Sequence, residues 1–179
     1  MRLDSAATGP EPALAPDIAE EAVDRLYRAH ALALVRLALL LVGDRTTAED
    51  VVQDAFLGLY RGWSRLRDSD SALGYLRASV VNGSRGVQRA RRTAWLRREP
   101  HQPPVWSAEA AAMDSEDQRA VLAAVARLPR RQREVLALRY YADLGDSEIA
   151  AVLRVSRGTV SSTASRALAT LARQLRAQE

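Results

Sequence analysis

The stretch at residues 146–171, "DSEIAAVLRVSRGTVSSTASRALATL", constrains the fold more than any other part of the chain. Its apolar residues have the spacing of two short helices that close on one small core. These residues are Ile149, Ala150, Leu153, Val155 and Val160. Ala150 is small where the second helix must pass close by, and Ser156 is a suitable N-cap for that helix. The pattern predicts a helix over about 146–153, a tight turn, and a second helix over about 157–175.

Two short helices joined by a tight turn are typical of the helix-turn-helix, whose second helix enters the major groove of DNA. Arginines surround the pattern, and residues 119–179 carry a net formal charge of +6. The nearest arginines are Arg130, Arg131, Arg133, Arg139, Arg154 and Arg157. A basic surface attracts phosphates. The charge therefore favours DNA binding over the alternative, an ordinary helical hairpin with a polar outer face.

Helical patterns also fill the N-terminal part of the chain. A first helix is predicted over about residues 17–42, because an acidic first turn opens it and Gly43 can close it. The next is predicted to begin at Thr46, the N-cap of a capping box in which Glu49 reaches back. Its apolar residues repeat at helical spacing: Ala48, Val51, Val52, Ala55, Phe56 and Leu59. A third helix is predicted over about 72–92, with Leu73, Leu76, Val80 and Val87 buried.

Two more helices are predicted before the helix-turn-helix. A second capping box begins at Ser115 and predicts a helix that ends near Arg127. Pro129 suits the first turn of another helix, which would run through Tyr141. Residues 93–114, in contrast, contain three prolines and a run of alanines without convincing periodicity, so we expect a linker there.

The predicted fold class is therefore all-α, with two small helical domains joined by a flexible linker. The expected boundaries are a disordered tail at 1–16, a first domain at 17–92, the linker at 93–114 and a second domain at 115–179. The tail has no apolar run, so it is not expected to be a signal peptide.

Composition excludes several classes of site. All 26 basic residues are arginine and cysteine is absent, so zinc fingers, disulfides, a phosphate-loop lysine and a Schiff-base lysine are excluded. His30 and His101 are far apart in sequence, and we expect no catalytic site, no metal and no cofactor. The most apolar stretch, residues 32–42, is interrupted by Arg36 and is too short to span a bilayer. We therefore expect a core helix there, no membrane insertion and a cytoplasmic protein.

Two charged helix faces have opposite signs. Residues 69–92 carry a net charge of +4, and a polar stripe along one exposed side of the third helix is formed by Asn82, Arg85, Arg89 and Arg92. On the side of the second helix opposite its apolar residues lie Glu49, Asp50, Gln53 and Asp54, here called the acidic face. Taken alone, each face could simply be solvated.

Three segments together resemble the bacterial RNA polymerase sigma factors. "GDRTTAEDVVQDAFLGLYRGW" is similar to their core-binding segment, and "YLRASVVNGSRGVQRARR" is similar to their promoter-melting helix. "LPRRQREVLALRYYADLGDSEIAAVLRVSRGTVSSTASRAL" resembles their terminal DNA-reading domain. The resemblance covers nearly all of residues 17–175. It points to the two-domain extracytoplasmic-function (ECF) class, because the additional domains of larger sigma factors are absent.

The resemblance implies a role for each charged face. The acidic face of Glu49, Asp50, Gln53 and Asp54 would contact the β′ clamp helices of core RNA polymerase, through charge-assisted hydrogen bonds to arginines. The polymerase β flap is a second implied contact. Promoter DNA would be the other partner. The implied −10 residues are Tyr75, Asn82, Arg85, Arg89 and Arg92, with Asn82 and the loop at 65–71 forming a pocket for a flipped-out base. The implied −35 residues are Arg157, Thr159, Ser161, Ser162, Ser165 and Arg166.

The recognition helix offers several hydroxyls but few strong base contacts. A good base contact gives about 1–3 kcal/mol of discrimination, whereas autonomous specific binders show roughly 4–10 kcal/mol. A polymerase that carries both reading domains would compensate through effective concentration. The hypothesis is thus a sigma factor that is not an enzyme and that directs promoter-specific initiation. Anti-sigma factors are common in this class. The alternative is a stand-alone helix-turn-helix regulator with an N-terminal dimerisation or sensing module.

Overall fold

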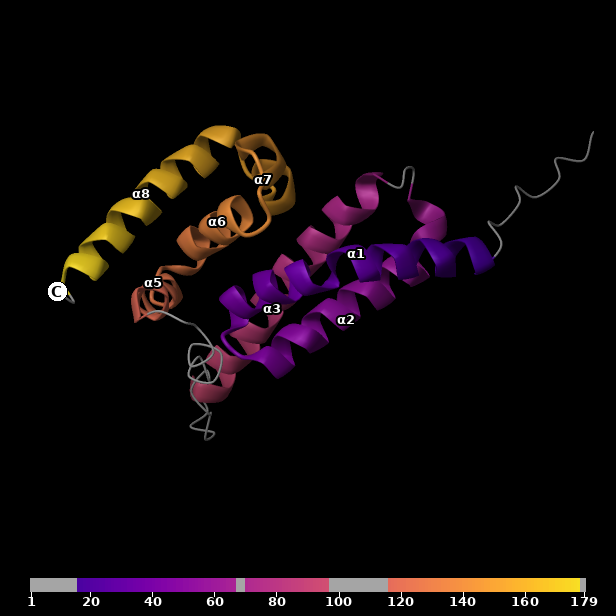
Figure 1. Cartoon of the computed structure of the whole chain (residues 1–179), viewed down its shortest axis with the longest axis horizontal. Helices are drawn as coiled ribbons and strands as arrows, with labels where there is room; N and C mark the ends of the chain where they lie inside the picture. Colours follow the sequence, from indigo (N-terminus) through magenta and orange to yellow (C-terminus); the bar gives the residue numbers. More distant parts are fainter. Residues whose placement is uncertain (1–15, 67–69, 97–115, 178–179) are drawn as a thin grey trace, which may run out of the picture.

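The computed structural model describes residues 16–66, 70–96 and 116–177, and every regular element in these ranges is a helix. Within the described residues, the N-terminal half has three long helices and one short 3-10 helix, and the C-terminal half has four helices. Figure 1 shows their arrangement. The elements are α1 (Pro16–Val42), α2 (Arg45–Arg61), η1 (Trp63–Arg65), α3 (Asp70–Leu96), α5 (Glu116–Ala126), α6 (Arg130–Tyr140), α7 (Asp146–Leu153) and α8 (Arg157–Arg176). The predicted all-α class is confirmed. The capping box at Ser115, the tail at 1–15 and most of the predicted linker lie outside the described residues.

The corner between α1 and α2 is formed by local capping. Gly43 has φ 88, the left-handed conformation that glycine adopts readily, and its N–H donates to the Leu39 carbonyl oxygen at 2.8 Å. The predicted N-cap at Thr46 is wrong, because Asp44 caps α2 by accepting from the Thr47 N–H at 2.9 Å. Glu49 does not complete a capping box and instead pairs with Arg45 at 2.6 Å. Only two residues separate the end of α1 from Arg45, so α2 must begin at the first available cap.

A side-chain clamp from α3 holds this corner. Gln88 Nε2 donates to the Leu41 carbonyl oxygen at 2.6 Å, and Arg91 donates to the Val42 carbonyl oxygen and to the Asp44 carboxylate. Carbonyls at a helix end lack partners within the helix, and these contacts satisfy two of them. Burial by itself raises the pKa of the Asp44 carboxyl, but hydrogen bonds from Thr47 and Arg91 outweigh burial and lower it.

The apolar residues of the three long helices form the core of the N-terminal half. All six apolar positions predicted for α2 are buried. On α3, Leu76 and Val80 are fully buried, whereas Leu73 and Val87 are half-buried. Figure 1 shows α1 and α2 side by side, with α3 crossing behind them. α3 extends to Leu96, four residues beyond its predicted end and into the stretch assigned to the linker.

The C-terminal half packs α5, α6 and α7 against α8. Ser156 caps α8 as predicted, because its side chain accepts from the Thr159 N–H at 3.1 Å. Pro129 is the residue before α6 rather than a member of its first turn. Ile149 and Val160 are fully buried where α7 and α8 meet, which is the small core predicted for the helix-turn-helix.

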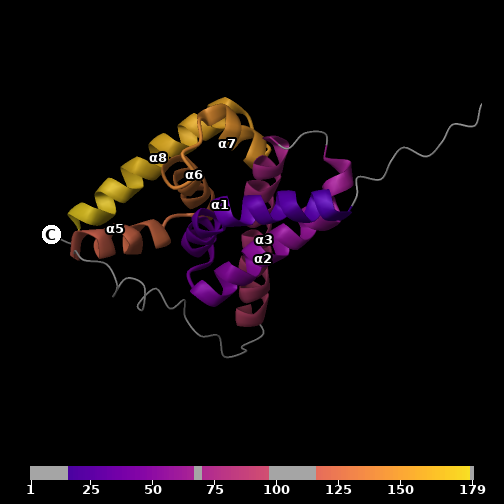
Figure 2. The same cartoon turned by 45° about the vertical axis from the view of Figure 1, so that its right-hand side comes forward.

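The two halves pack against each other. α1 contacts α5 and α6, and α3 contacts α7. Figure 2, in which the molecule is turned, again places α6 and α7 beside α1 and α3. One continuous cluster of buried apolar side chains runs through both halves; it includes Leu37 and Leu41 from α1 and Leu138 from α6. The described helices thus share one core across the expected domain boundary.

The role of Asp44 can be tested by two substitutions. Asp44→Ala removes the cap and the partner of Arg91, whereas Asp44→Asn keeps a good N-cap and removes only the charge. We expect Asp44→Ala to lower the free energy of unfolding by about 1–2 kcal/mol and Asp44→Asn by less.

The pH dependence of the same variants isolates the charge. The Asp44 pKa is lowered on folding, so the carboxylate stabilises the fold above its unfolded pKa of about 3.9, and this is lost as the pH falls through the folded pKa. The stability gap between wild type and Asp44→Asn in urea denaturation should therefore close in acid. A gap that stays constant from neutral pH into acid would contradict this role.

Candidate nucleic-acid interface

The outer face of α8 carries the residues predicted to contact DNA. Arg157, Thr159, Ser161, Ser162, Ser165 and Arg166 are all exposed and are here called the reading face. On the opposite side of α8, Val160, Thr163, Ala164 and Ala167 are buried against the other helices. α8 forms the outer edge of the molecule, away from α1 and α2 (Figure 1). None of the described helices therefore covers the part of α8 that would enter a groove.

Several polar side chains of the reading face fold back onto their own helix. Ser162 and Ser165 donate to the carbonyl oxygens of Thr159 and Ser161 at 3.2 and 3.1 Å. Arg166 Nε donates to the Ser162 carbonyl oxygen at 3.2 Å. Hydroxyls bonded in this way can still accept hydrogen bonds, but they must exchange a helix contact to donate one. The reading face therefore offers mainly hydrogen-bond acceptors and two guanidinium groups, Arg157 at the start of α8 and Arg166 in its middle.

The polar stripe of α3 is only partly exposed. Asn82, Arg89 and Arg92 are exposed as predicted. The expectation that Arg85 also lies on an exposed side is wrong in this conformation, because its side chain is only 18% exposed. Its guanidinium donates from Nε and Nη2 to the two carboxylate oxygens of Glu134 on α6, at 2.7 and 2.8 Å, and from Nη1 to Asn82 Oδ1 at 3.3 Å.

Glu134 is a buried carboxylate surrounded by arginines. Its side chain is 1% exposed, and besides Arg85 it accepts from Arg131 at 3.0 Å and lies 3.6 Å from Arg130. Burial by itself raises the pKa of this carboxyl, but the hydrogen bonds from Arg85 and Arg131 outweigh it and lower the pKa. The hydrogen bond to Glu134 raises the pKa of the Arg85 guanidinium. Both groups are therefore charged at neutral pH.

A cavity of about 380 Å³ opens at the end of α3 that carries Tyr75. It is lined by Gly58, Leu59, Arg61, Gly62, Arg65, Leu66 and Tyr75. Tyr75 is 40% exposed, so its ring is accessible rather than part of the core. A Cβ atom at Gly58 would come within 3.0 Å of the Tyr75 hydroxyl, so the glycine keeps this wall open. Residues 67–69 of the predicted base pocket lie outside the described residues.

The acidic face lies on the solvent side of α2. Glu49, Asp50, Gln53 and Asp54 are all exposed, while the apolar residues between them are buried. In Figure 1, α2 lies at the lower edge of the N-terminal half, away from the C-terminal helices. The structure thus puts the acidic face and the reading face on different helices and on different sides of the molecule.

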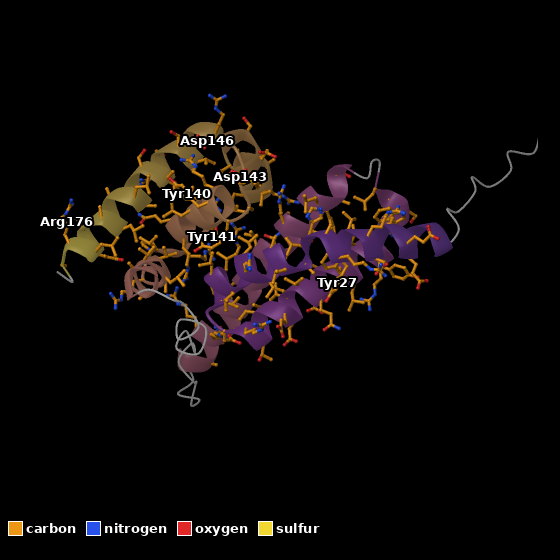
Figure 3. All side chains as sticks on the ribbon, in the orientation of Figure 1. Tyr27, Tyr140, Tyr141, Asp143, Asp146 and Arg176 are labelled. Atoms are coloured by element: carbon orange, nitrogen blue, oxygen red, sulfur yellow. The ribbon has the colours of Figure 1, made fainter. Side chains whose placement is uncertain are left out.

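A second cavity, of about 410 Å³, lies where the halves meet. It is apolar in character and is lined by Leu40, Val121, Val125, Leu136, Ala137, Tyr140, Tyr141, Leu168 and Leu171. Figure 3 shows Tyr140 within the C-terminal half and Tyr141 on the side that faces the N-terminal half. Burial raises the pKa of the Tyr141 hydroxyl. Sequence reasoning missed this junction, although two adjacent tyrosines at the end of a helix are a visible signal.

Sequence reasoning also missed Glu134 and Arg77. Arg77 Nη2 donates to the Ala142 carbonyl oxygen at 3.3 Å and so adds a second polar contact between the halves. Partners so far apart in the chain leave no local pattern. Among the described residues, no group of three or more His, Cys, Asp or Glu side chains is arranged to hold a metal ion. None of the described helices is long and apolar enough to cross a membrane.

Comparisons with known proteins match both halves to one family. The family model "Sigma-70 region 2" matches residues 26–96, and "Sigma-70, region 4" matches residues 118–171. The chain is 35% identical over 153 residues to the RNA polymerase sigma-E factor of Streptomyces coelicolor, covering 82% of each chain. It is 33% identical over 156 residues to the ECF RNA polymerase sigma factor SigM of Mycobacterium tuberculosis, covering 86% of this chain and 77% of the relative.

Two solved structures have a similar fold. CnrH, in complex with the cytosolic domain of CnrY, is 25% identical with a TM-score of 0.67, covering 92% of this chain and 98% of CnrH. The sigma factor RpoE of Bartonella quintana, in complex with the anti-sigma factor NepR, is 21% identical with a TM-score of 0.75, covering 87% of this chain and 98% of that chain. Both similarities extend over the N-terminal and the C-terminal half together.

Proposed function

The chain belongs to the ECF class of the sigma-70 family of RNA polymerase sigma factors, and we propose how its surfaces divide the work of promoter-specific initiation. The N-terminal half, residues 17–92, binds core RNA polymerase and reads the −10 element. The C-terminal half, residues 115–179, reads the −35 element. The observation that carries this division is that the acidic face and the reading face are both exposed on separate helices. One protein can therefore contact polymerase and DNA at once.

The acidic face is proposed as the contact with the β′ clamp helices of polymerase. Two of its acids, Asp50 and Asp54, are one helical turn apart and exposed, so both can reach one partner surface. Carboxylates form strong, short hydrogen bonds with arginines. The same charges repel DNA, which keeps this face available for protein. The C-terminal half is proposed to contact the β flap.

The −10 surface is proposed to combine the polar stripe of Asn82, Arg85, Arg89 and Arg92 with the cavity beside Tyr75. The exposed arginines would hold phosphates, and the ring of Tyr75 can stack on an unpaired base. Unstacking a base costs a few kcal/mol, so a cavity that accepts the base helps to keep the strands apart. Arg61 and Arg65 line the same cavity, and their positive charge would attract the phosphates next to the unpaired base.

The reading face is proposed to contact the −35 element through Arg157, Thr159, Ser161, Ser162, Ser165 and Arg166. The hydroxyls of Ser162 and Ser165 donate back to the helix and so supply little discrimination. Arg166 is the one mid-helix guanidinium and is the strongest candidate for a base contact. Discrimination then depends on the polymerase, which presents both reading domains to one promoter.

Membership of this family also bears on catalysis, location and regulation. The chain itself catalyses no reaction, because RNA synthesis belongs to the polymerase that it joins. It acts in the cytoplasm, where the polymerase transcribes. An anti-sigma factor regulates it, a proposal supported by the fold shared with the RpoE–NepR complex. A stand-alone regulator is not favoured, because the matched relatives are sigma factors over most of the chain.

Charge reversal tests the acidic face. Asp50→Arg with Asp54→Arg should lower affinity for core polymerase by about a hundredfold or more, since each charge-assisted hydrogen bond contributes about 1.5–3 kcal/mol. The measurement is co-purification with core, followed by run-off transcription. Glu20→Arg with Glu21→Arg changes two exposed acids of α1 by the same charge and serves as the control. Retention of core by the Asp50/Asp54 variant would refute the proposed surface.

An alanine substitution tests the reading face. Arg166→Ala should reduce transcription from a −35-dependent promoter by about five- to a hundredfold, corresponding to a contact of about 1–3 kcal/mol, and should leave core binding unchanged. Arg173→Ala, an exposed arginine of the same helix outside the reading face, is the matched control. If Arg166→Ala and Arg173→Ala have equal effects, α8 does not read the −35 element through Arg166.

A further inference from the structure

The ion pair between Arg85 and Glu134 joins the DNA-facing side of α3 to the C-terminal half. Both carboxylate oxygens of Glu134 are engaged by the Arg85 fork, at 2.7 and 2.8 Å. Arg77 adds a hydrogen bond from the same helix to the Ala142 carbonyl oxygen. The pair is therefore part of the contact between the halves. Among the described residues, Arg85 is the one residue proposed to contact DNA that forms an ion pair with an acid of the other half.

Glu134 presents Arg85 with the same chemistry as a phosphate. A carboxylate and a phosphate each offer two oxygens to the guanidinium fork, and both form bidentate, charge-assisted pairs. The fork can serve only one such partner at a time. Arg85 lies in the polar stripe with Asn82, Arg89 and Arg92, where DNA phosphates are proposed to bind. While the Arg85 guanidinium is paired with Glu134, only two of the three arginines of the stripe can bind phosphates.

The closed arrangement also prevents simultaneous reading of two promoter elements. α8 contacts α7, and α7 contacts α3. Packed helix axes lie about 8–10 Å apart, so the axes of α8 and α3 are about 16–20 Å apart where α7 lies between them. Two elements separated by two helical turns of DNA are about 70 Å apart. The halves must separate before one chain can contact both elements.

The pair is suited to reversible opening. When the ion pair with Arg85 breaks, the Glu134 carboxylate is still paired with Arg131 and Arg130 of its own helix. Opening therefore does not leave the charge of Glu134 unpaired. Desolvation offsets much of the attraction in a buried ion pair, so its net contribution is modest. A contact of this kind can hold the halves together in the free chain and yet yield to a competing phosphate.

We propose that Glu134 is an internal substitute for a DNA phosphate, which occupies Arg85 and latches the C-terminal half onto α3 in the free chain. Promoter DNA and polymerase replace the latch when the chain opens. The proposal rests on the proposed function in one respect, namely that Arg85 belongs to the −10 surface.

A distance measurement in the free, full-length chain tests the latch. The chain has no cysteine, so Ala29→Cys on α1 and Ala169→Cys on α8, both exposed, give a single labelled pair. The doubly labelled chain with no further substitution should show one narrow distribution of short distances between the two spin labels. Adding Glu134→Gln, which is nearly isosteric, should increase the population at long distances by about fivefold or more.

Asp146→Asn is the matched control. Asp146 is also an acid of the C-terminal half that pairs with an arginine, but its partner, Arg139, lies in the same half. The two substitutions change the net charge equally, and only Glu134→Gln breaks a contact between the halves. Asp146→Asn should keep the short distance. If Glu134→Gln loses the helical circular dichroism signal, Arg85→Gln breaks the same pair from the other side and should lengthen the distance instead.

Binding of the free chain to a mixed-sequence duplex provides a second readout. Glu134→Gln releases Arg85, so it should bind about fivefold or more tightly than Asp146→Asn, with a slope of log affinity against log salt that is steeper by about 0.9, the value for one phosphate contact. The equal net charge of the two variants removes the general electrostatic effect.

Two outcomes would overturn the latch: a distance distribution unchanged by both Glu134→Gln and Arg85→Gln, or equal opening by Asp146→Asn. The distance measurement contains neither polymerase nor DNA. A chain that opens on Glu134→Gln but supports no transcription with core would refute the proposed function and leave the latch in place. A chain that transcribes but does not open would refute only the latch.

Discussion

A single buried carboxylate, Glu134, forms the bidentate ion pair that joins the two halves of the molecule. A charge that is almost fully buried must be paired and hydrogen-bonded, and α6 itself provides only part of this through Arg131 and the more distant Arg130. The bidentate partner is Arg85 of α3, so Glu134 is fully satisfied only when the halves are docked. The apolar cluster that runs from α1 into α6 supports the same arrangement. The docking in turn decides which DNA-facing groups are accessible.

This constraint fits a DNA reader that depends on a larger partner. The reading face offers hydroxyls bonded to their own helix and a single mid-helix arginine, so its specific contacts are few. The polar stripe of α3 has one of its cations occupied. With so few contacts, neither surface alone is expected to reach the roughly 4–10 kcal/mol of discrimination found in autonomous binders. An enzyme that separates the halves and holds both near one promoter supplies the missing selectivity through effective concentration.

Local sequence patterns predicted the helices well, because periodicity and capping depend on neighbours in the chain. The buried side of α2, the left-handed Gly43 and the Ser156 cap all follow from a few adjacent residues. The cap at Thr46 failed because two good caps compete there, and the choice of Asp44 is reinforced by Arg91 from α3, which is distant in sequence. Exposure of the acidic face and the reading face was also predictable, since each lies opposite an apolar stripe.

The contact between the halves could not be predicted in the same way. Arg85 and Glu134 are 49 residues apart, and Glu134 stands in a run of arginines where it resembles an ordinary helix-surface partner. Nothing local indicates that α6 will be buried against α1 or that an arginine of the polar stripe will turn toward an acid. Only the docking of helices from both ends of the chain brings these groups together.

The most direct test of the central claim is the affinity of the purified full-length chain for a short promoter duplex, measured with and without core polymerase at fixed salt. The account predicts that the free chain binds promoter and scrambled duplexes weakly and about equally, and that core polymerase makes binding tight and selective for the promoter. Tight, selective binding by the free chain would contradict it.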